Sequence, residues 1–234
     1  SADDAKFITN SYNNLEEISL PSENGIKLHG WFLKNSAAKR TPAVIYFGGN
    51  ADEVSALLGF ARQFEGWSLA LFNYRGYGLS EGKPGEAALK HDSLLIYDYI
   101  ASRNDVDAGR IIIMGRSLGT GVAVYVVSER KAKAVILVSP YDDFAGVAQD
   151  AYPLMPVKLL LRTHFKSIEL APSIFTPVLA LVAEKDTIVL PKRSTALLEK
   201  WAGPHKLVVI RDKGHNDISE SDIYWENIKM FIAE

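Results

Sequence analysis

The sequence contains no cysteine among its 234 residues. This absence excludes a disulfide framework or disulfide partner and a thiolate zinc site, but it does not choose a cellular compartment. An excess of one charge is also lacking. The formal net charge of −2 argues against general binding to nucleic acid or to an acidic membrane surface. No apolar run approaches the roughly 20 residues that cross a bilayer.

The chain begins at Ser1 rather than at methionine, and polar residues follow. We interpret this start as a processing boundary, with removal of an N-terminal signal or membrane anchor as one explanation. The sequence leaves the compartment and the oligomeric state open.

Short apolar runs recur along the chain, and most of them are apolar nearly throughout. This pattern is typical of strands buried on both faces of a parallel sheet. Amphipathic helical patterns alternate with these runs, which predicts an α/β three-layer sandwich with a mostly parallel sheet. The length suits a single domain over residues 1–234. We expect a hairpin over 15–33 and strands, most of them buried, at 42–47, 68–74, 110–115, 133–139, 177–183 and 206–210. We expect helices at 54–64, at 117–130 and at the C-terminus, where Ser219 and Asp222 would form a capping box.

The segment 140–176 interrupts the alternation of strands and helices. It is too long for an ordinary connection between a strand and a helix, and it is rich in Tyr, Met, Leu and Pro. A small lid-like insertion that forms a pocket wall is one interpretation. A helix that packs on the core, with loops around it, is the other.

In the stretch "IIIMGRSLGTG", an apolar run is followed by Gly115, Ser117, Gly119 and Gly121, whose role has to be explained. A P-loop would need a lysine that is missing here. The spacing of Gly115, Gly119 and Gly121 resembles the cofactor turn of short-chain dehydrogenases, but no tyrosine has a lysine four residues later. A nucleophile elbow fits better, because Gly115-Arg116-Ser117-Leu118-Gly119 matches G-x-S-x-G between a strand and a helix.

The two glycines of the motif have a steric reason. Larger side chains two residues before and two residues after Ser117 would collide at the tight turn. Gly121 lies outside the motif, and we expect it to let the helix pack closely on the sheet. A serine hydroxyl needs a general base. His215 follows the strand at 206–210, at the sheet edge where Ser117 also lies. By contrast, His205 precedes that strand and His164 lies in the long segment.

An acid should orient the imidazole of the base. Asp186 follows the strand at 177–183 and is our first choice, while Asp142 and Asp143 are the alternative. The loop "FGGNAD" after the strand at 42–47 predicts a second oxyanion donor at the Asn50 N–H, beside the N–H of Leu118.

These segments together resemble the α/β-hydrolase superfamily, from about Leu15 to the C-terminus. The stretches "NYRGYGLSEGKPGE", "VSPYDDF" and "GHND" resemble a branch of small serine-peptidase-like hydrolases related to protein depalmitoylases. The family's oxyanion loop usually begins His-Gly, whereas Gly48 stands here, so this loop lacks a side chain that helps to fix it. We expect Arg75 in "YRGYG" to be a structural ion-pair partner.

The sequence therefore predicts a serine hydrolase that cleaves carboxylic esters or thioesters through an acyl-enzyme, without a metal or an organic cofactor. We expect a small-molecule or lipid-like acyl substrate. Two alternatives stay open, a serine peptidase or amidase and a catalytically silent binding protein of the same fold. The candidate residues of an apolar acyl pocket are Tyr141, Tyr152, Leu154 and Met155.

Overall fold

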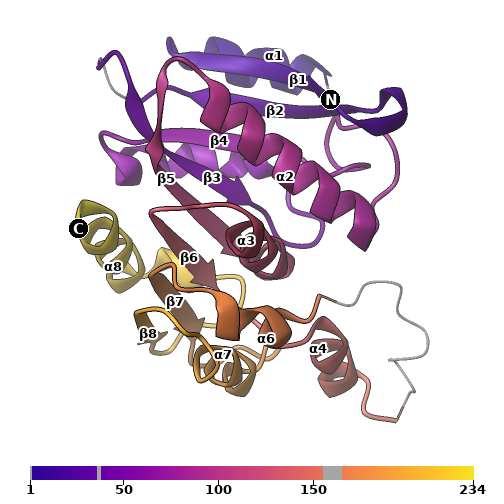
Figure 1. The fold of residues 1–234 in the computed structure, drawn as a ribbon, viewed down its shortest axis with the longest axis vertical. Coiled ribbons are helices and arrows are strands. Elements are labelled where there is room, and N and C mark those ends of the chain that lie inside the picture. Colours follow the sequence, from indigo (N-terminus) through magenta and orange to yellow (C-terminus); the bar gives the residue numbers. More distant parts are fainter. Residues whose placement is uncertain (1, 36–37, 155–164) are drawn as a thin grey trace.

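One eight-stranded sheet runs through the molecule, with the order β1-β2-β4-β3-β5-β6-β7-β8 (Figure 1). The computed structural model describes residues 2–35, 38–154 and 165–234. Each strand overlaps a segment where the sequence predicts one, but the strand predicted at 206–210 is not buried, because it lies at the edge of the sheet and Leu207 and Val209 are 40% and 47% exposed. The strands are β1 (Leu15–Pro21), β2 (Lys27–Leu33), β3 (Thr41–Phe47), β4 (Ser68–Phe72), β5 (Val106–Arg116), β6 (Ala134–Val138), β7 (Val178–Ala183) and β8 (His205–Ile210).

The strands from β3 to β8 pair in parallel, whereas β1 and β2 form the predicted antiparallel hairpin and β2 joins β4 antiparallel. The prediction of a mostly parallel sheet is therefore confirmed. Because parallel strands all end at one edge, the loops that follow β3, β5, β7 and β8 meet there.

Two hydrophobic cores lie on opposite faces of the sheet. Along β3, Val44 and Tyr46 belong to one core, and Ile45 and Phe47 to the other. The helices α2 and α3 cover one face, as Figure 1 shows, while η2 and α8 pack on the other. The predicted three-layer sandwich is confirmed. The helices are α1 (Ala2–Asn10), η1 (Glu23–Gly25), η2 (Val54–Phe64), α2 (Glu86–Ser102), α3 (Leu118–Glu129), α4 (Phe144–Ala151), α6 (Ser167–Leu170), η3 (Ala171–Ser173), α7 (Pro191–Leu198), η4 (Ile218–Glu220) and α8 (Asp222–Ala233).

Two local predictions differ from the structure. Residues 54–64 form a 3₁₀ helix, because apolar residues spaced three and four apart fit this tighter helix as well as an α-helix over so few turns. The predicted cap at Ser219 is wrong, since α8 begins after Ser221 and the Ser219 carbonyl instead accepts from the indole N–H of Trp225 at 2.8 Å. In the described ranges, no helix is long and apolar enough to cross a membrane.

The described ends of the segment 140–176 contribute to the core. Phe165, Ala171 and Ile174 are buried in the same cluster as α3, and α6 and η3 pack against this helix. These parts match the interpretation of a core-packing helix with loops. Met155 and His164 lie outside the described residues.

Candidate active site

Ser117 stands at a turn between β5 and α3. Its backbone has φ +50° and ψ −119°, a conformation that residues with a side chain seldom adopt. Such strain costs about 1–3 kcal/mol, so the surrounding structure must hold it. The Ser117 N–H donates to the carbonyl oxygen of Val138 at 2.9 Å and so ties the turn to β6. The half-buried serine therefore has the strained backbone that the motif predicts.

The motif glycines are needed for close backbone contact. A methyl group on Gly115 would collide with the carbonyl of Gly119, and one on Gly119 would collide with the carbonyls of Phe47 and Gly48. The start of α3 thus lies directly against the loop that follows β3. Gly121 differs from the prediction, because its nearest neighbours are Tyr141 and Phe165 rather than the sheet.

His215 and Asp186 form a buried pair. Nδ1 of His215 lies 2.8 Å from Oδ2 of Asp186, and Oδ1 of Asp186 accepts from the backbone N–H groups of Ile188 at 3.0 Å and Val189 at 2.8 Å. Burial by itself raises the pKa of Asp186, but interactions with His215, Ser139 and the backbone of Val189 outweigh it and keep this pKa below its ordinary value. The carboxylate is therefore charged at neutral pH and orients the imidazole.

The alternative acids have other partners. Both carboxylate oxygens of Asp142 accept from Arg193 at 3.2 Å, and Asp143 caps α4 by accepting from the N–H of Ala145. His205 begins β8, at the opposite edge of the sheet. The geometry thus brings Asp186, and neither Asp142 nor Asp143, to His215.

Ser117 and His215 come from neighbouring loops but share no hydrogen bond in the described part of the chain. Their connection runs through Arg116, whose guanidinium donates to the carbonyl oxygen of His215 at 3.1 Å and to Oδ1 of Asn216 at 3.3 Å. Catalytic hydrogen bonds are often formed only when substrate is bound. Because Nδ1 is held by Asp186, the nitrogen of His215 left for proton transfer is Nε2.

The loop after β3 contains the Asn50 N–H, for which the sequence predicts a role as second oxyanion donor. The N–H of Gly49 donates to Oδ2 of Asp52 at 2.6 Å and is therefore unavailable to a ligand. Within the described residues, the N–H groups of Asn50 and Leu118 have no hydrogen-bond partner. The contact of Gly119 with the end of β3 brings the two segments together. They are the candidate oxyanion donors.

Side chains from other elements hold this loop where the family has a histidine. The hydroxyl of Tyr74 donates to the carbonyl of Gly48 at 2.9 Å, and that of Tyr77 donates to Oδ1 of Asn50 at 2.7 Å. Asp52 also pairs with Arg116 at 3.1 Å. The loop is therefore fixed by tyrosines of "YRGYG", although Gly48 itself has no side chain.

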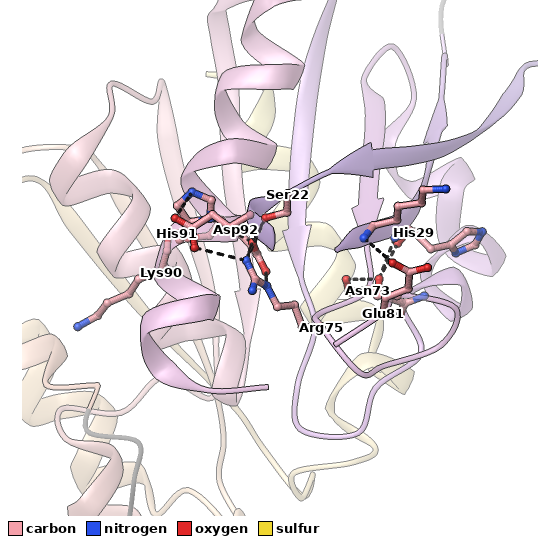
Figure 2. A network of polar contacts seen from close by, with 12 residues as sticks. Ser22, His29, Asn73, Arg75, Glu81, Lys90, His91 and Asp92 are labelled. Atoms are coloured by element: carbon pink, nitrogen blue, oxygen red, sulfur yellow. Dashed lines mark hydrogen bonds and ion pairs between the residues drawn. The ribbon is translucent and has the colours of Figure 1, made fainter. Parts of the chain in front are cut away.

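Arg75 anchors the same "YRGYG" loop to the hairpin and to α2 (Figure 2). Its guanidinium donates to both carboxylate oxygens of Asp92, at 2.5 and 2.7 Å, and to the hydroxyl of Ser22 at 3.0 Å. Ser22 in turn donates to Asp92 at 2.6 Å. Arg75 is buried, so the prediction of a structural ion-pair partner is confirmed.

The predicted acyl pocket is not assembled by the residues that the sequence indicated. Tyr141 is only 1% exposed and donates to the carbonyl of Leu118 at 3.2 Å, so its side chain packs in the core beside α3. Tyr152 and Leu154 are 61% and 98% exposed. Met155 lies outside the described residues.

A family model described as "Serine aminopeptidase, S33" matches residues 38–168, which include the oxyanion loop and the elbow. The chain belongs to the S33 family. An uncharacterized protein of Mycobacterium tuberculosis is 34% identical over 222 residues, covering 93% of this chain and 79% of that protein. The α/β-hydrolase domain-containing protein WAV2 of Arabidopsis thaliana is 30% identical over 242 residues, covering 94% and 79%.

An esterase of Pyrococcus furiosus shares the fold with this S33 member. Its TM-score is 0.75 at 18% identity, with 98% of this chain and 92% of the esterase covered. The family match and the similarity to the α/β-hydrolase domain-containing protein confirm the resemblance to the α/β-hydrolase superfamily, and the protein is a hydrolase of this fold.

Sequence reasoning missed the residues that support the site of this S33 member. Arg116 occupies a variable position of G-x-S-x-G, and Asp52 was read only as part of a loop. Tyr74 and Tyr77 were noted as part of a family stretch, without a role. The signal that could have identified them is that two tyrosines stand close together in "YRGYG", directly after a strand that ends at the same sheet edge as Ser117.

Proposed function

We propose that the chain is a serine hydrolase of carboxylic esters or thioesters, with Ser117 as nucleophile, His215 as general base and Asp186 as the orienting acid. The observation that carries the proposal is the buried 2.8 Å pair of Asp186 and His215 at the sheet edge that also holds Ser117 on its strained turn. A nucleophile, a base and an orienting acid are the parts that acyl transfer requires.

The reaction proceeds in two halves. Ser117 Oγ attacks the carbonyl carbon while Nε2 of His215 takes its proton, and the oxyanion accepts hydrogen bonds from the N–H groups of Asn50 and Leu118. Collapse of the tetrahedral intermediate expels the alcohol or thiol, which receives the proton from His215. Water then attacks the acyl-enzyme with the same proton transfers, and the carboxylic acid leaves.

An ester or thioester substrate is favoured over the amino terminus of a peptide. An aminopeptidase must bind a positively charged amine, which calls for a free carboxylate beside the nucleophile. In the described part of the chain, the carboxylates near the site have partners: Asp52 binds Arg116, Glu53 accepts from Asn73 at 2.8 Å, and Asp186 binds His215.

A fluorophosphonate probe tests the nucleophile. We expect the wild type to be labelled and Ser117→Ala not to be, and we expect this variant to lose about 10⁴-fold or more in kcat on para-nitrophenyl acetate. Absence of labelling in the wild type would support the silent binding protein. Equal labelling of Ser117→Ala would refute the assignment.

The acid has its own test. Asp186→Asn should lower kcat far more than Asp142→Asn or Asp143→Asn, because only Asp186 contacts His215. The opposite order would move the triad to the loop after β6. A panel that compares para-nitrophenyl acetate with alanine para-nitroanilide separates ester from aminopeptidase activity.

A further inference from the structure

A cavity of about 380 Å³ lies between η2 and α8, on the face of the sheet opposite α3. Cavities of this size are at the lower end of those that hold small molecules. Its walls are mostly apolar or aromatic, and Phe60 and Trp225 stack with their ring centroids 4.9 Å apart. The apolar walls are formed by Val54, Leu57, Phe60, Met114 and Trp225.

The rim of this cavity is formed by the neighbours of the candidate catalytic groups. Ala51 and Asp52 follow Asn50, Arg116 precedes Ser117, and Asn216 follows His215, and all four residues line the cavity. Asn50, Ser117 and His215 therefore each have a chain neighbour in the cavity wall. Tyr141 and Leu154, by contrast, do not line it.

The charged groups at the rim are already satisfied. Arg116 pairs with Asp52 and donates to the carbonyl of His215, and Glu53 accepts from Asn73. The carboxylates of Asp52 and Glu53 would repel an anion, and the guanidinium of Arg116 would repel a cation. The charge pattern therefore favours an occupant without net charge.

Two tyrosines that line the cavity have hydroxyls without a hydrogen-bond partner among the residues that the structure describes. Tyr46 and Tyr224 are 7% and 3% exposed and line the cavity, and neither hydroxyl forms a hydrogen bond within the described residues. The hydroxyls of Tyr74 and Tyr141, in contrast, donate to backbone carbonyls. Burial raises the pKa of both Tyr46 and Tyr224, so they remain protonated donors. Both hydroxyls can therefore donate to an acceptor on a bound molecule.

We propose that this cavity binds the acyl part of the substrate, and that this part is uncharged, apolar or aromatic, and carries a hydrogen-bond acceptor such as a carbonyl oxygen for Tyr46 and Tyr224. The inference rests on the proposed hydrolysis at Ser117 and defines its substrate class. Stacking between Phe60 and Trp225 shows that aromatic surfaces already pack at this place.

Three para-nitrophenyl esters test the proposal: the acetate, the phenylbutanoate and the benzoylpropanoate, which adds a ketone to the aryl chain. In the wild type, both aryl esters should have a higher kcat/KM than the acetate. The ketone should add about threefold to tenfold, the value of one hydrogen bond.

Two sets of variants then separate cavity shape from hydrogen bonding. Leu57→Trp fills the cavity and should lower the ratio of either aryl ester to acetate by about tenfold or more. Tyr46→Phe combined with Tyr224→Phe should remove the preference for the ketone and keep the ratio of phenylbutanoate to acetate. Leu79→Trp and Tyr125→Phe, outside the cavity, are the matched controls and should leave these ratios as they are.

The outcomes are distinguishable. If the wild type hydrolyses acetate but gains nothing from the aryl chain, or if both sets of variants keep the wild-type ratios, the cavity proposal is overturned while the proposed hydrolysis stands. If no ester is turned over and the fluorophosphonate does not label Ser117, the proposed function itself fails. If Leu57→Trp does not fold, the double variant tests the proposal alone: a preference for the ketone equal to that of the wild type would overturn it.

Discussion

The loop from Gly48 to Glu53 and the segment 140–176 both follow strands that end at the catalytic edge, and they are built in opposite ways. The short loop contains two adjacent glycines, yet Tyr74, Tyr77 and Arg116 hold it from outside. The long segment is rich in apolar side chains, but its described ends are buried in the core, while Leu154 is almost fully exposed.

This difference shows that apolar composition does not by itself make a substrate pocket, and that glycine does not by itself make a loop mobile. A glycine-rich loop is fixed when its backbone groups meet side chains from other elements. Four experiments test the comparison, beginning with the one that should have the largest effect.

Asp92→Ala removes the partner of Arg75 and should have the largest effect on stability. It leaves a buried guanidinium with only the exposed carboxylate of Glu23, 4.0 Å away, so we expect the free energy of unfolding to fall by about 3–5 kcal/mol. Urea denaturation measures this loss. The side chains of Arg75 and Asp92 are 9% and 4% exposed.

The control for this prediction is Asp98→Ala. Its partner Arg130 is 33% exposed and Asp98 itself is 52% exposed, so this pair should contribute less than about 1 kcal/mol. Equal losses in the two variants would mean that the "YRGYG" loop is not held by its buried ion pair.

Arg116→Met tests the connection between the two sides of the active site. The substitution removes the hydrogen bonds to Asp52 and to the carbonyl of His215, so both loops lose a common anchor. A misplacement of about 1 Å costs about 10²-fold in rate, and we expect kcat on para-nitrophenyl acetate to fall by that order.

The free energy of unfolding of this variant should change little, because Arg116 is half-buried and its former partners can form hydrogen bonds with water instead. Arg116→Lys should recover only part of the rate, since one ammonium cannot replace the two-sided contacts of a guanidinium. Arg130→Met is the control. A normal kcat for Arg116→Met would show that each loop holds its position alone.

The sequence was sufficient to predict the parts that depend on local patterns. Each apolar run corresponds to a strand, and the order of the runs predicts which loops share an edge. The pairing of Asp186 with His215 follows from this topology, because β7 and β8 are adjacent. The glycines around Ser117 also have a local steric reason.

What the sequence did not predict depends on partners that are distant along the chain. Spacing does not reveal that Tyr74 reaches Gly48 or that Arg116 reaches His215, because both contacts arise only when the sheet is assembled. Tyr141 was assigned to a pocket because an aromatic residue has the same composition signal in a core and in a cavity. The cavity between η2 and α8 draws on five separate segments and has no motif.

Tyr74→Phe should lower the free energy of unfolding by less than Asp92→Ala does. It leaves the carbonyl of Gly48 without its donor, which costs about 1–3 kcal/mol of stability for a buried group. Thermal denaturation measures this cost, and labelling by fluorophosphonate reports the position of the oxyanion loop. Tyr77→Phe should cost less, because its partner Asn50 is exposed. The reverse order would place the main support of the loop at Asn50.

Leu154→Ser should have the smallest effect, and it tests the other side of the comparison directly. The side chain is 98% exposed, so its replacement should change the free energy of unfolding by less than about 0.5 kcal/mol. If the acyl chain enters the cavity between η2 and α8, the ratio of aryl ester to acetate should stay at the wild-type value. A clear fall in this ratio would instead make the segment 140–176 a wall of the acyl site, as its composition predicted, because an exposed leucine affects a substrate only by touching it.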